Sequence, residues 1–472
     1  MPSKILHNLL LLLLLPLSSC HIVSVDSDDK IYQDRYLLLD SRIIEKVDNA
    51  KLSVGKVTKH PNNPLLMEDK PWEKRFDNFY GNMVYDETDG IYKLWYSPFI
   101  VDYSAKGMSL SEMQEKEYMA PKDREMAICY ATSQDGIEWE KPNLGLVDFN
   151  GSTNNNILWR GPHGAGIYKD PYEKDYNRLY KMLTRINETT GTLATSYSSD
   201  GIIWSKPSRV KLDGLAGDTH NNLLWDSKSE TYVGITRTWG EMGREVMRIE
   251  SNDFNTWKKD KVIMTSKDKI RQPYAMPVFF HAGVFLGLVA VHEQPPVDRV
   301  WTELAWSPDT KIWHRIDEGT PLIPCSDKVL DYDYGCVYSC TNPIFLKNEI
   351  RIYYGGSDYL HYEWRTGNLS LATLRPDGFA GYKQLKENKS AIILTKDIPY
   401  IGKRIRISCD VEEGGSVNAE ILDKKGNVLS DSQPIKATVT DGALLLSKPV
   451  NVGEIRLRFT LNNAILYSFS LQ

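Results

Sequence analysis

The chain has 472 residues, of which 57 are basic and 62 acidic, for a formal net charge of −5, and 41% of the residues are hydrophobic. Charges of both signs are interspersed along the chain, which excludes the basic patch of a nucleic-acid-binding protein. The length and the hydrophobic fraction suffice for one large core and one small core.

The first 20 residues have the pattern of a bacterial export signal. Lys4 precedes a leucine-rich core from Leu9 to Leu15, which is too short to span a bilayer as a permanent helix. The ending Leu17–Cys20 resembles a lipoprotein box, in which the cysteine becomes the lipidated first residue of the mature protein. An ordinary cleaved signal peptide with an incidental cysteine is the alternative. The pattern predicts an exported protein, lipid-anchored through Cys20 to a bacterial membrane on the outer-membrane, periplasmic or cell-surface side.

Residues 21–70 combine an acidic tether with two hydrophobic runs. Asp26–Asp29 follows the cysteine and has the composition of a solvated tether. The runs Leu37–Ile44 and Leu52–Val57 are expected to form strands that add to the edge of a following sheet and help to close a ring of sheets.

A motif with the pattern Asp-x-x-x-Trp occurs four times in the middle of the chain. Neighbouring copies, with a looser fifth copy included, are 53 to 68 positions apart, and a sustained period of this size indicates a repeat architecture. Before each Asp lies a short alternating run typical of a strand that enters a hairpin, and Asp-Gly suits the positive-φ positions of its turn. The copies begin at Asp135, Asp200, Asp253 and Asp309, with a looser fifth copy at Asp377.

Two further β-rich runs precede each hairpin, so each unit is expected to contain four strands. Five such units are the sequence signature of a β-propeller. We therefore predict an all-β fold in which residues 71–384 form a five-bladed β-propeller. A β-sandwich, or tandem β-domains with coincidental spacing, is the alternative. Helical periodicity is confined largely to Ser109–Met119, an insertion in the first unit.

The rhythm of the sequence changes near Tyr382. Short alternating runs such as Arg404–Val411 and Ile455–Leu461 follow, separated by turn sequences such as Glu413–Gly415, and no further copy of the motif occurs. Residues 385–472 are therefore expected to form a small β-sandwich packed on the propeller. The five cysteines after Cys20 form an odd, irregularly spaced set, which predicts free thiols instead of a disulfide framework.

The expected first strands of the five blades are rich in polar residues, and in a propeller these strands line the central channel. Carboxylates around such a funnel suit glycoside cleavage, in which one acts as base or nucleophile and another as acid. Arg, Asn, Gln and Tyr side chains can bind sugar hydroxyls, and aromatic rings can stack on sugars. The blade starts contribute Arg75, Asp77 and Asn78; His163, Lys169 and Asp170; Asp218, His220, Asn221 and Asn222; Arg271, Gln272 and Tyr274; and Asp331, Asp333 and Tyr334.

Several of these segments resemble the five-bladed propeller glycoside hydrolases of the superfamily that contains families 32, 43, 62, 68 and 117. The resemblance rests on Arg75–Asn78, on Lys169–Pro171 and on the Asp-Gly-x-x-Trp hairpins. The segment Tyr353–Asp358 with His361 resembles an uncharacterised, family-32-like bacterial branch. The resemblance covers the chain from about Leu39 to its C-terminal end and is sharpest in the propeller.

The resemblance implies roles for the acidic residues. Asp77 matches the base or nucleophile, and Asp170 matches the residue that orients the substrate or tunes the acid. The acid of the relatives is usually a third-blade glutamate, but here the matching segment is Asp218–Asn222. Asp218 or His220 is therefore the candidate acid, as family 117 uses a histidine. Glu241, Glu293 and Glu303 remain alternatives, and the expected substrate-binding residues are Arg75, Asn78, Asn221, Arg271, Gln272, Tyr274, Asp333 and His361.

Each of these residues also has a structural interpretation. Asp77 could cap a strand start, Asp170-Pro171 could be only a turn, and His220 could be a satisfied channel residue. Asp333 is more typical of a binding residue than of a catalyst.

The sequence thus predicts a glycosidase acting on an oligo- or polysaccharide, with inversion favoured by analogy with families 43 and 117. A non-catalytic carbohydrate-binding lipoprotein is the alternative, because the third-blade glutamate is absent. A purely structural propeller would have an apolar channel mouth, against which the polar blade starts argue. No cofactor is required, a single structural cation in the channel remains open, and no nucleic-acid partner is expected.

Overall fold

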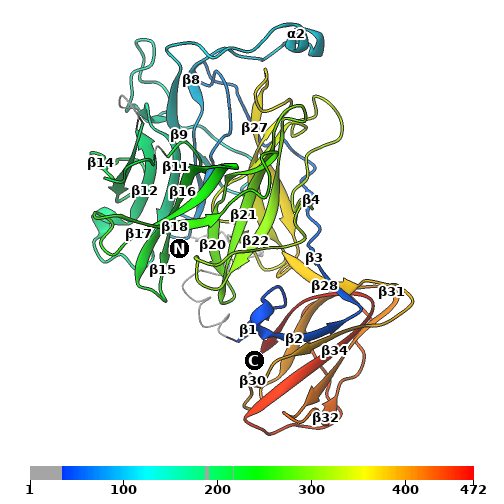
Figure 1. Ribbon diagram of the computed structural model, residues 1–472. Helices are drawn as coiled ribbons and strands as arrows, with labels where there is room; N and C mark the ends of the chain where they lie inside the picture. The colour runs from blue at the N-terminus through cyan, green and yellow to red at the C-terminus, as the bar shows by residue number, and fades with distance from the viewer. Residues whose placement is uncertain (1–33, 187–190, 216) are drawn as a thin grey trace, which may run out of the picture.

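The computed structural model describes residues 34–186, 191–215 and 217–472 (Figure 1). The predicted all-β class is confirmed, because strands form nearly all of the regular structure, and the insertion predicted as helical contains α2 (Leu110–Glu115). Cys20 and the rest of the predicted export signal lie outside the described residues. Within the described ranges, no helix combines the length and the apolar character needed to cross a membrane.

The predicted repeat units form antiparallel sheets in chain order. The first sheet contains β6 (Asn82–Asp86), β7 (Ile91–Tyr96), β8 (Phe99–Val101), β9 (Glu125–Ser133) and β10 (Ile157–Arg160). The second contains β11 (His163–Lys169), β12 (Tyr180–Ile186), β13 (Thr192–Ser198) and β14 (Ser208–Arg209). The third contains β15 (Asn222–Asp226), β16 (Thr231–Gly240), β17 (Gly243–Ser251) and β18 (Lys258–Met264).

The last two units share one eleven-stranded sheet, joined by a single parallel pair between Val300 and Cys336. We call its two parts the fourth and fifth strand groups. The fourth contains β19 (Arg271–Ala275), β20 (Val278–His281), β21 (Val284–Glu293), β22 (Arg299–Ser307) and β23 (His314–Arg315). The fifth contains β24 (Cys336–Ser339), β25 (Ile344–Phe345), β26 (Ile350–Ser357), β27 (Gly367–Leu374) and the early strands β4 (Thr58–Lys59) and β5 (Leu66–Met67).

A local hydrogen-bonded turn explains the repeated motif. Asp135 Oδ1 accepts hydrogen bonds from the backbone amides of Ile137 (2.8 Å) and Glu138 (2.9 Å), and Ser133 Oγ donates to the same carboxylate. The residue after the Asp has positive φ, as predicted for Asp-Gly, and non-glycine residues adopt the same conformation in two copies. The equivalent carboxylates, with the same pair of amide contacts, are Asp200, Asp253 and Asp309.

Side chains at the start of the first strands connect neighbouring sheets. Asn82 donates to the backbone oxygen of Ala165 (2.7 Å) and accepts from the amide of Ile167 (2.8 Å), which joins the first sheet to the second. Asn222 accepts from the amide of Val278 (3.0 Å), which joins the third sheet to the fourth group.

The fifth group contacts the first sheet again. The amide of Thr341 donates to the backbone oxygen of Gly81 (2.9 Å), and Tyr353 Oη donates to the backbone oxygen of Gly136 (2.9 Å). The second and third sheets are joined by the amide of Asn221, which donates to the backbone oxygen of Gly164 (3.0 Å). Sheet-to-sheet contacts therefore run from the first group to the fifth and back to the first.

The N-terminal strands pair mostly with the C-terminal part of the chain. Strands β1 (Arg35–Leu37), β2 (Ile44–Asp48) and β3 (Ala50–Val54) pair with β34 (Glu454–Leu471), β29 (Ala391–Thr395) and β28 (Ala380–Gln384). The expectation that Leu37–Ile44 and Leu52–Val57 add to the edge of a repeat sheet is therefore wrong. That position is taken by β4 and β5, which pair with β27.

The C-terminal region is a ten-stranded sheet at the end of the molecule opposite α2 (Figure 1). Its strands β31 (Ile405–Leu422) and β34 pair along most of their length. The sequence predicts two shorter strands in place of each, Arg404–Val411 with Asn418–Leu422 and Ile455–Leu461 with Ala464–Leu471. The predicted turn Glu413–Gly415 is a bulge inside β31, because β34 continues to pair on both sides of it. The remaining strands are β30 (Ile398–Pro399), β32 (Val428–Asp431) and β33 (Val439–Ala443).

Asp377, in the looser fifth copy of the motif, connects this sheet to the rest of the molecule. Its buried carboxylate accepts from Ser468 Oγ (2.6 Å) and Ser408 Oγ (3.3 Å) and forms an ion pair with Arg35. His281 Nε2 of the fourth group lies 3.6 Å from the same carboxylate. In this fifth copy, the aspartate of the motif therefore binds side chains of the C-terminal sheet.

Candidate active site

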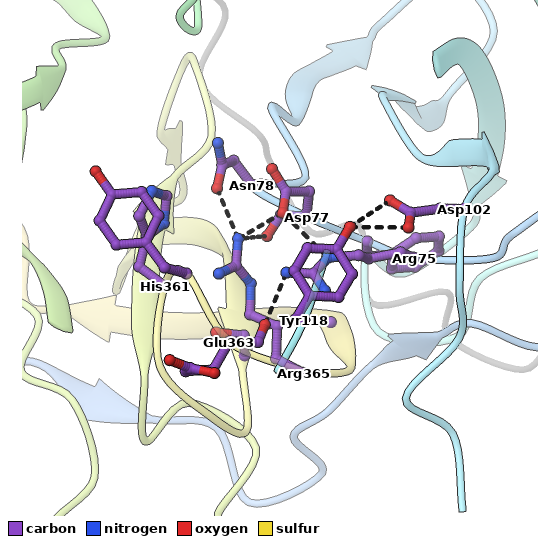
Figure 2. Close-up of polar contacts among 12 residues, drawn as sticks. Arg75, Asp77, Asn78, Asp102, Tyr118, His361, Glu363 and Arg365 are labelled. Carbon is purple, nitrogen blue, oxygen red and sulfur yellow. Dashed lines mark hydrogen bonds and ion pairs between the residues drawn. The ribbon is translucent and has the colours of Figure 1, made fainter. Parts of the chain in front are cut away.

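Asp77 lies in the segment that leads into β6 and is contacted by three arginines, of which Arg75 and Arg365 are labelled in Figure 2. Its Oδ1 lies 2.6 Å from Arg365 Nη2, 3.2 Å from Arg75 Nε and 3.7 Å from Arg124 Nη2. Arg75 and Arg365 are buried, whereas the Asp77 side chain keeps 16% of its surface exposed. The carboxylate is therefore held by protein on one side and reachable from the other.

The charges around Asp77 determine its protonation state. Burial alone would raise the pKa of Asp77, but the guanidinium groups of Arg365, Arg75 and Arg124 outweigh burial and lower that pKa. The carboxylate is an anion at neutral pH. Such a group can attack an electron-poor carbon or accept a proton from water, but it cannot protonate a leaving group.

The insertion of the first sheet covers one side of this cluster. Tyr118 Oη donates to Asp102 (2.8 Å), and Arg124 Nε donates to the same carboxylate (2.7 Å). The Tyr118 ring lies 4.1 Å from the guanidinium of Arg75 and packs edge-on against the ring of Trp364, at 5.2 Å between centroids. Aromatic rings and arginines therefore meet next to Asp77.

Asn78 extends the network toward the third and fourth strand groups. Its Oδ1 accepts from Arg365 Nη2 (3.2 Å), and its Nδ2 donates to Tyr274 Oη (3.0 Å). The guanidinium of Arg237 lies 4.3 Å from the centre of the Tyr274 ring, and the His361 ring lies 5.0 Å from it. The predicted residues Asn78, Tyr274 and His361 are thus brought together with Asp77.

Asp218 belongs to the same network through Arg237. Its carboxylate lies 3.0 Å from His163 Nε2, 3.3 Å from Arg185 Nη1 and 3.7 Å from Arg237 Nη1, and 54% of the side chain is exposed. The hydrogen bond with His163 and the neighbouring guanidiniums hold the pKa of Asp218 well below its usual range, although burial acts against them. A general acid needs the opposite shift.

His220 is a buried residue near the start of β15. Its Nε2 lies 3.4 Å from Asn82 Oδ1, and its ring packs 5.5 Å from the Tyr80 ring. Burial lowers the pKa of His220 to about 3, so the imidazole is neutral at physiological pH. These contacts fit the structural interpretation of His220, as a buried residue whose hydrogen bonds are made within the protein, better than the role of a proton donor.

Asp170 does not lie beside Asp77. It follows β11, at the end of the strand opposite to His163, and is fully buried. Its carboxylate accepts from Tyr232 Oη of the third sheet (2.7 Å) and forms an ion pair with Lys181 Nζ (3.0 Å). The sequence suggested a substrate-orienting role, but these contacts join the second and third sheets.

The same arrangement occurs one sheet earlier, where Asp86 ends β6. Asp86 pairs with Lys93 (2.8 Å) and accepts from Tyr180 Oη of the second sheet (2.6 Å). Asp170 is therefore one copy of a repeated contact between sheets, which is a physical reason for an Asp at this position.

Two predicted binding residues are also occupied by structural contacts. Asn221 is fully buried, and its Nδ2 donates to the backbone oxygens of Gly164 (2.8 Å) and Gly217 (2.9 Å). The buried Asp333 accepts from Tyr354 Oη (2.8 Å) and pairs with Lys59 of β4 (2.7 Å). Both side chains are bound to neighbouring strands, and among the contacts of the described residues none links either of them to Asp77.

The fourth group supplies two more of the predicted binding residues. Gln272 is buried, and its Oε1 accepts from Arg244 Nη1 (2.9 Å). Arg271 is half-exposed and lies 3.5 Å from Glu293, one of the alternative acids. Glu303 is buried against Trp301 and Arg315, and Glu241 has an exposed position after β16.

Sequence reasoning missed Arg365, Arg124, Asp102 and Tyr118. These residues lie in loops or in the insertion, where no repeat marks them. It also missed Glu68, whose Oε1 accepts from the amides of Phe76 (2.5 Å) and Gly367 (2.9 Å) and so fixes the segments that carry Asp77 and Arg365. Burial raises the pKa of Glu68 to about 8.

The described residues contain no cluster of candidate metal ligands and no disulfide. Within the described ranges, no three His, Cys, Asp or Glu side chains are grouped so that they could hold a metal ion. The five described cysteines are free thiols, as predicted, and all but Cys325 are fully buried.

No protein-family profile and no curated protein matches the chain. Similar solved structures include a glycosyl hydrolase from Bacteroides ovatus, with 15% identity over 68% of this chain and 94% of that chain and a TM-score of 0.46. A GH130-family structure, from work on glycoside hydrolases that target β-1,2-mannosidic linkages in Candida mannan, has 15% identity over 69% and 95% of the two chains and a TM-score of 0.45. A fructofuranosidase from Schwanniomyces occidentalis, in complex with fructosylnystose, has 9% identity over 86% and 96% and a TM-score of 0.42. These neighbours are glycoside hydrolases, and the role of the site in this chain rests on its own geometry.

Proposed function

We propose that the protein is a glycoside hydrolase that cleaves a glycosidic bond in an oligo- or polysaccharide, with Asp77 as base or nucleophile. The observation that carries the proposal is the Asp77 carboxylate, which three guanidiniums keep ionised while part of it stays exposed. Such a carboxylate can attack the anomeric carbon, or activate a water, opposite an oxocarbenium-like transition state. The rings of Tyr118 and Trp364 provide faces on which sugar rings stack.

We also propose that the five strand groups are the blades of a propeller, which includes β4 and β5 in addition to strands from the predicted range 71–384. Residues 385–472, together with β1 to β3 and β28, would form the small sandwich. The contacts that lead from each group to the next, and from the fifth back to the first, support the propeller. In that arrangement Asp77 and Asp218 face one funnel.

A non-catalytic carbohydrate-binding protein is the second candidate, and one observation favours it. Neither predicted acid has the raised pKa that protonation of a leaving group needs, since the pKa values of Asp218 and His220 are both lowered. Glu68 has a raised pKa, but its side chain is buried, with Oε1 bound by two backbone amides and Oε2 shielded from solvent. Figure 2 shows the Glu363 carboxylate pointing away from Asp77, while the Glu363 backbone oxygen accepts from Arg75 (2.9 Å).

Aryl glycosides and oligosaccharides separate the two candidates, because an aryl leaving group departs without protonation and a sugar does not. We expect Asp77→Asn to reduce turnover of both substrate types by about 100-fold or more. If Asp218 donates the proton in the bound complex, Asp218→Asn slows only oligosaccharide cleavage. Full turnover by Asp77→Asn would contradict the proposal, and binding without turnover over a broad panel would support the second candidate.

We propose, from the sequence pattern alone, that the chain is exported and anchored to a bacterial membrane by a lipid on Cys20. Metabolic labelling with an alkyne fatty acid should mark the wild-type protein in the membrane fraction. Cys20→Ser should remove the label and release the protein from that fraction. An unlabelled wild-type protein would contradict the anchor.

A further inference from the structure

The network around Asp77 and Asp218 contains more guanidinium groups than carboxylates. The carboxylates of Asp77, Asp102 and Asp218 form ion pairs within 4.0 Å with five arginines. A sixth guanidinium, that of Arg244, lies 5.0 Å from the Tyr274 ring. Six guanidiniums against these three carboxylates and the carboxylate of Asp298, which lies next to Arg244, leave an excess of two positive charges. The five paired arginines are Arg75, Arg124, Arg185, Arg237 and Arg365.

Arg244 has only neutral partners among the residues that the structure describes. It is 8% exposed, its Nη1 donates to Gln272 Oε1 (2.9 Å), and its Nη2 donates to Tyr362 Oη (3.1 Å). Its Nε is buried without a hydrogen-bond partner. The neighbouring Asp298 carboxylate is occupied by His292 Nε2 (2.9 Å) and the amide of Tyr362 (2.7 Å). A buried guanidinium without a counter-ion is costly, and an anion placed beside it offsets that cost.

The arginines that hold Asp77 also keep unused donors. Arg75 Nη1 and Arg365 Nε are buried and have no hydrogen-bond partner within the described part of the chain. Asp77 therefore does not saturate the hydrogen-bonding capacity of its own neighbours. Buried donors of this kind are normally satisfied, and a bound acceptor is one way to satisfy them.

Exposed aromatic rings border Arg244. The Trp239 ring is 62% exposed and lies 5.1 Å from the Arg244 guanidinium, and the Tyr362 ring is 45% exposed. An exposed ring can stack on a sugar while a neighbouring guanidinium binds the acidic substituent of that sugar. Guanidinium groups match carboxylates and oxyanion esters because they offer two parallel N–H donors.

We infer that the carbohydrate bound at this site is acidic, and that Arg244 binds the carboxylate or sulfate group that it carries. The inference rests on the proposed function, since it names the substrate class of the same site. Trp239 and Tyr362 would stack on the sugar that bears the acidic group, and Asp77 would act on an adjacent glycosidic bond.

The test compares binding of matched acidic and neutral oligosaccharides by isothermal titration calorimetry. One pair is an oligogalacturonide and its carboxyl-reduced counterpart, and a second pair is a sulfated galactan oligosaccharide and its desulfated counterpart. We expect at least one acidic member to bind about 10-fold or more tightly than its neutral partner. The pair that shows the preference identifies the acidic group.

Arg244→Gln should reduce that preference to less than about 2-fold, while affinity for the neutral partner stays within the same range. The matched control is Arg458→Gln, which removes a half-buried arginine paired with Glu420 in the C-terminal sheet and should keep the preference. If Arg244→Gln does not fold, the wild-type comparison alone decides.

Cleavage of the same oligosaccharides is measured in parallel, so that a failure of the acidic-substrate inference can be told apart from a failure of the proposed hydrolase function. Absence of any preference for an acidic member, including absence of binding to both members of each pair, would overturn the inference. It would leave hydrolysis of neutral substrates to support the proposed function. Tight binding of an acidic member without cleavage by the wild-type protein would support the inference and count against hydrolysis.

Discussion

At the scale of single residues, the ionisation of Asp77 depends on its neighbours. Arg365 is fully buried and makes the shortest of the three ion pairs, at 2.6 Å. An opposite charge within about 4–6 Å lowers a carboxyl pKa by roughly 1–3 units. Because the pKa of Asp77 is lowered, the group stays ionised as the pH falls below the usual carboxyl range. Activity that requires ionised Asp77 is therefore retained in mild acid.

Removing the charge of Arg365 should move the acidic limb of the pH profile. In Arg365→Gln the pKa of Asp77 rises, so kcat/KM should begin to fall at a pH about 1 unit higher than in the wild type. The measurement is kcat/KM against pH on an aryl glycoside, where leaving-group protonation does not limit the rate. Arg458→Gln serves as the control, and identical acidic limbs for Arg365→Gln and wild type would show that Asp77 does not set this limb.

At the scale of secondary-structure elements, the contacts between sheets repeat along with the strands. Asp86 and Asp170 end the first strands of consecutive sheets, and each binds a lysine of its own sheet and a tyrosine of the next. The ion pair of Asp170 with Lys181 is fully buried, and Lys181 has a second, less buried counter-ion in Glu173 at 2.9 Å. Removing the charge of Asp170 would leave the buried ammonium of Lys181 with Glu173 alone.

Asp170→Asn should therefore reduce stability and spare catalysis. We expect a loss of about 2 kcal/mol in the free energy of unfolding, since the variant removes one charged partner of Lys181 and leaves it paired with Glu173 alone. Urea denaturation measures the loss, and kcat/KM of the folded variant should stay within about 2-fold of the wild-type value. A large fall in kcat/KM at unchanged stability would restore the catalytic role that the sequence suggested.

The elements that could be predicted from the sequence are those whose hydrogen bonds join residues that are near one another in the chain. The turn at Asp135 uses acceptors and donors between Ser133 and Glu138, so its signature survives in a short stretch of sequence. The pairing of Tyr36 with Phe469 leaves no such signature, because it joins residues 433 positions apart. Asp77 was found because it opens a repeat unit, whereas Arg365 lies in a loop outside the repeat.

At the scale of the whole molecule, one buried carboxylate joins parts of the chain that are remote in sequence. Asp377 contacts Arg35 at the start of the described chain, His281 in the fourth group, and Ser408 and Ser468 in the C-terminal sheet. His281, the guanidinium of Arg35 and the hydroxyl of Ser468 hold the pKa of Asp377 below its usual range, although burial acts to raise it. The ion pairs therefore contribute stability at neutral pH, and that contribution is lost as the pH falls through the folded-state pKa.

Asp377→Asn should loosen the C-terminal sheet from the remaining sheets. We expect a loss of about 3–5 kcal/mol in stability, as for other buried ion pairs from which one partner is removed. Hydrogen exchange should show faster exchange in β1, β28 and β34 than in β7 or β16. Glu413→Gln, an exposed change in the same sheet, is the control, and uniform exchange in both variants would show that Asp377 does not hold the interface.

The early strands β1 to β3 limit how the protein can be shortened for expression. A fragment that stops at residue 384 would keep β1 and β2 but lose β34 and β29, the strands with which they pair. Trimming one end alone would thus uncover hydrogen-bonding edges at the other. Leu37 and Leu39 also belong to the core beneath β21 and β22, so a catalytic fragment without both ends would need polar replacements for the apolar surface they leave behind.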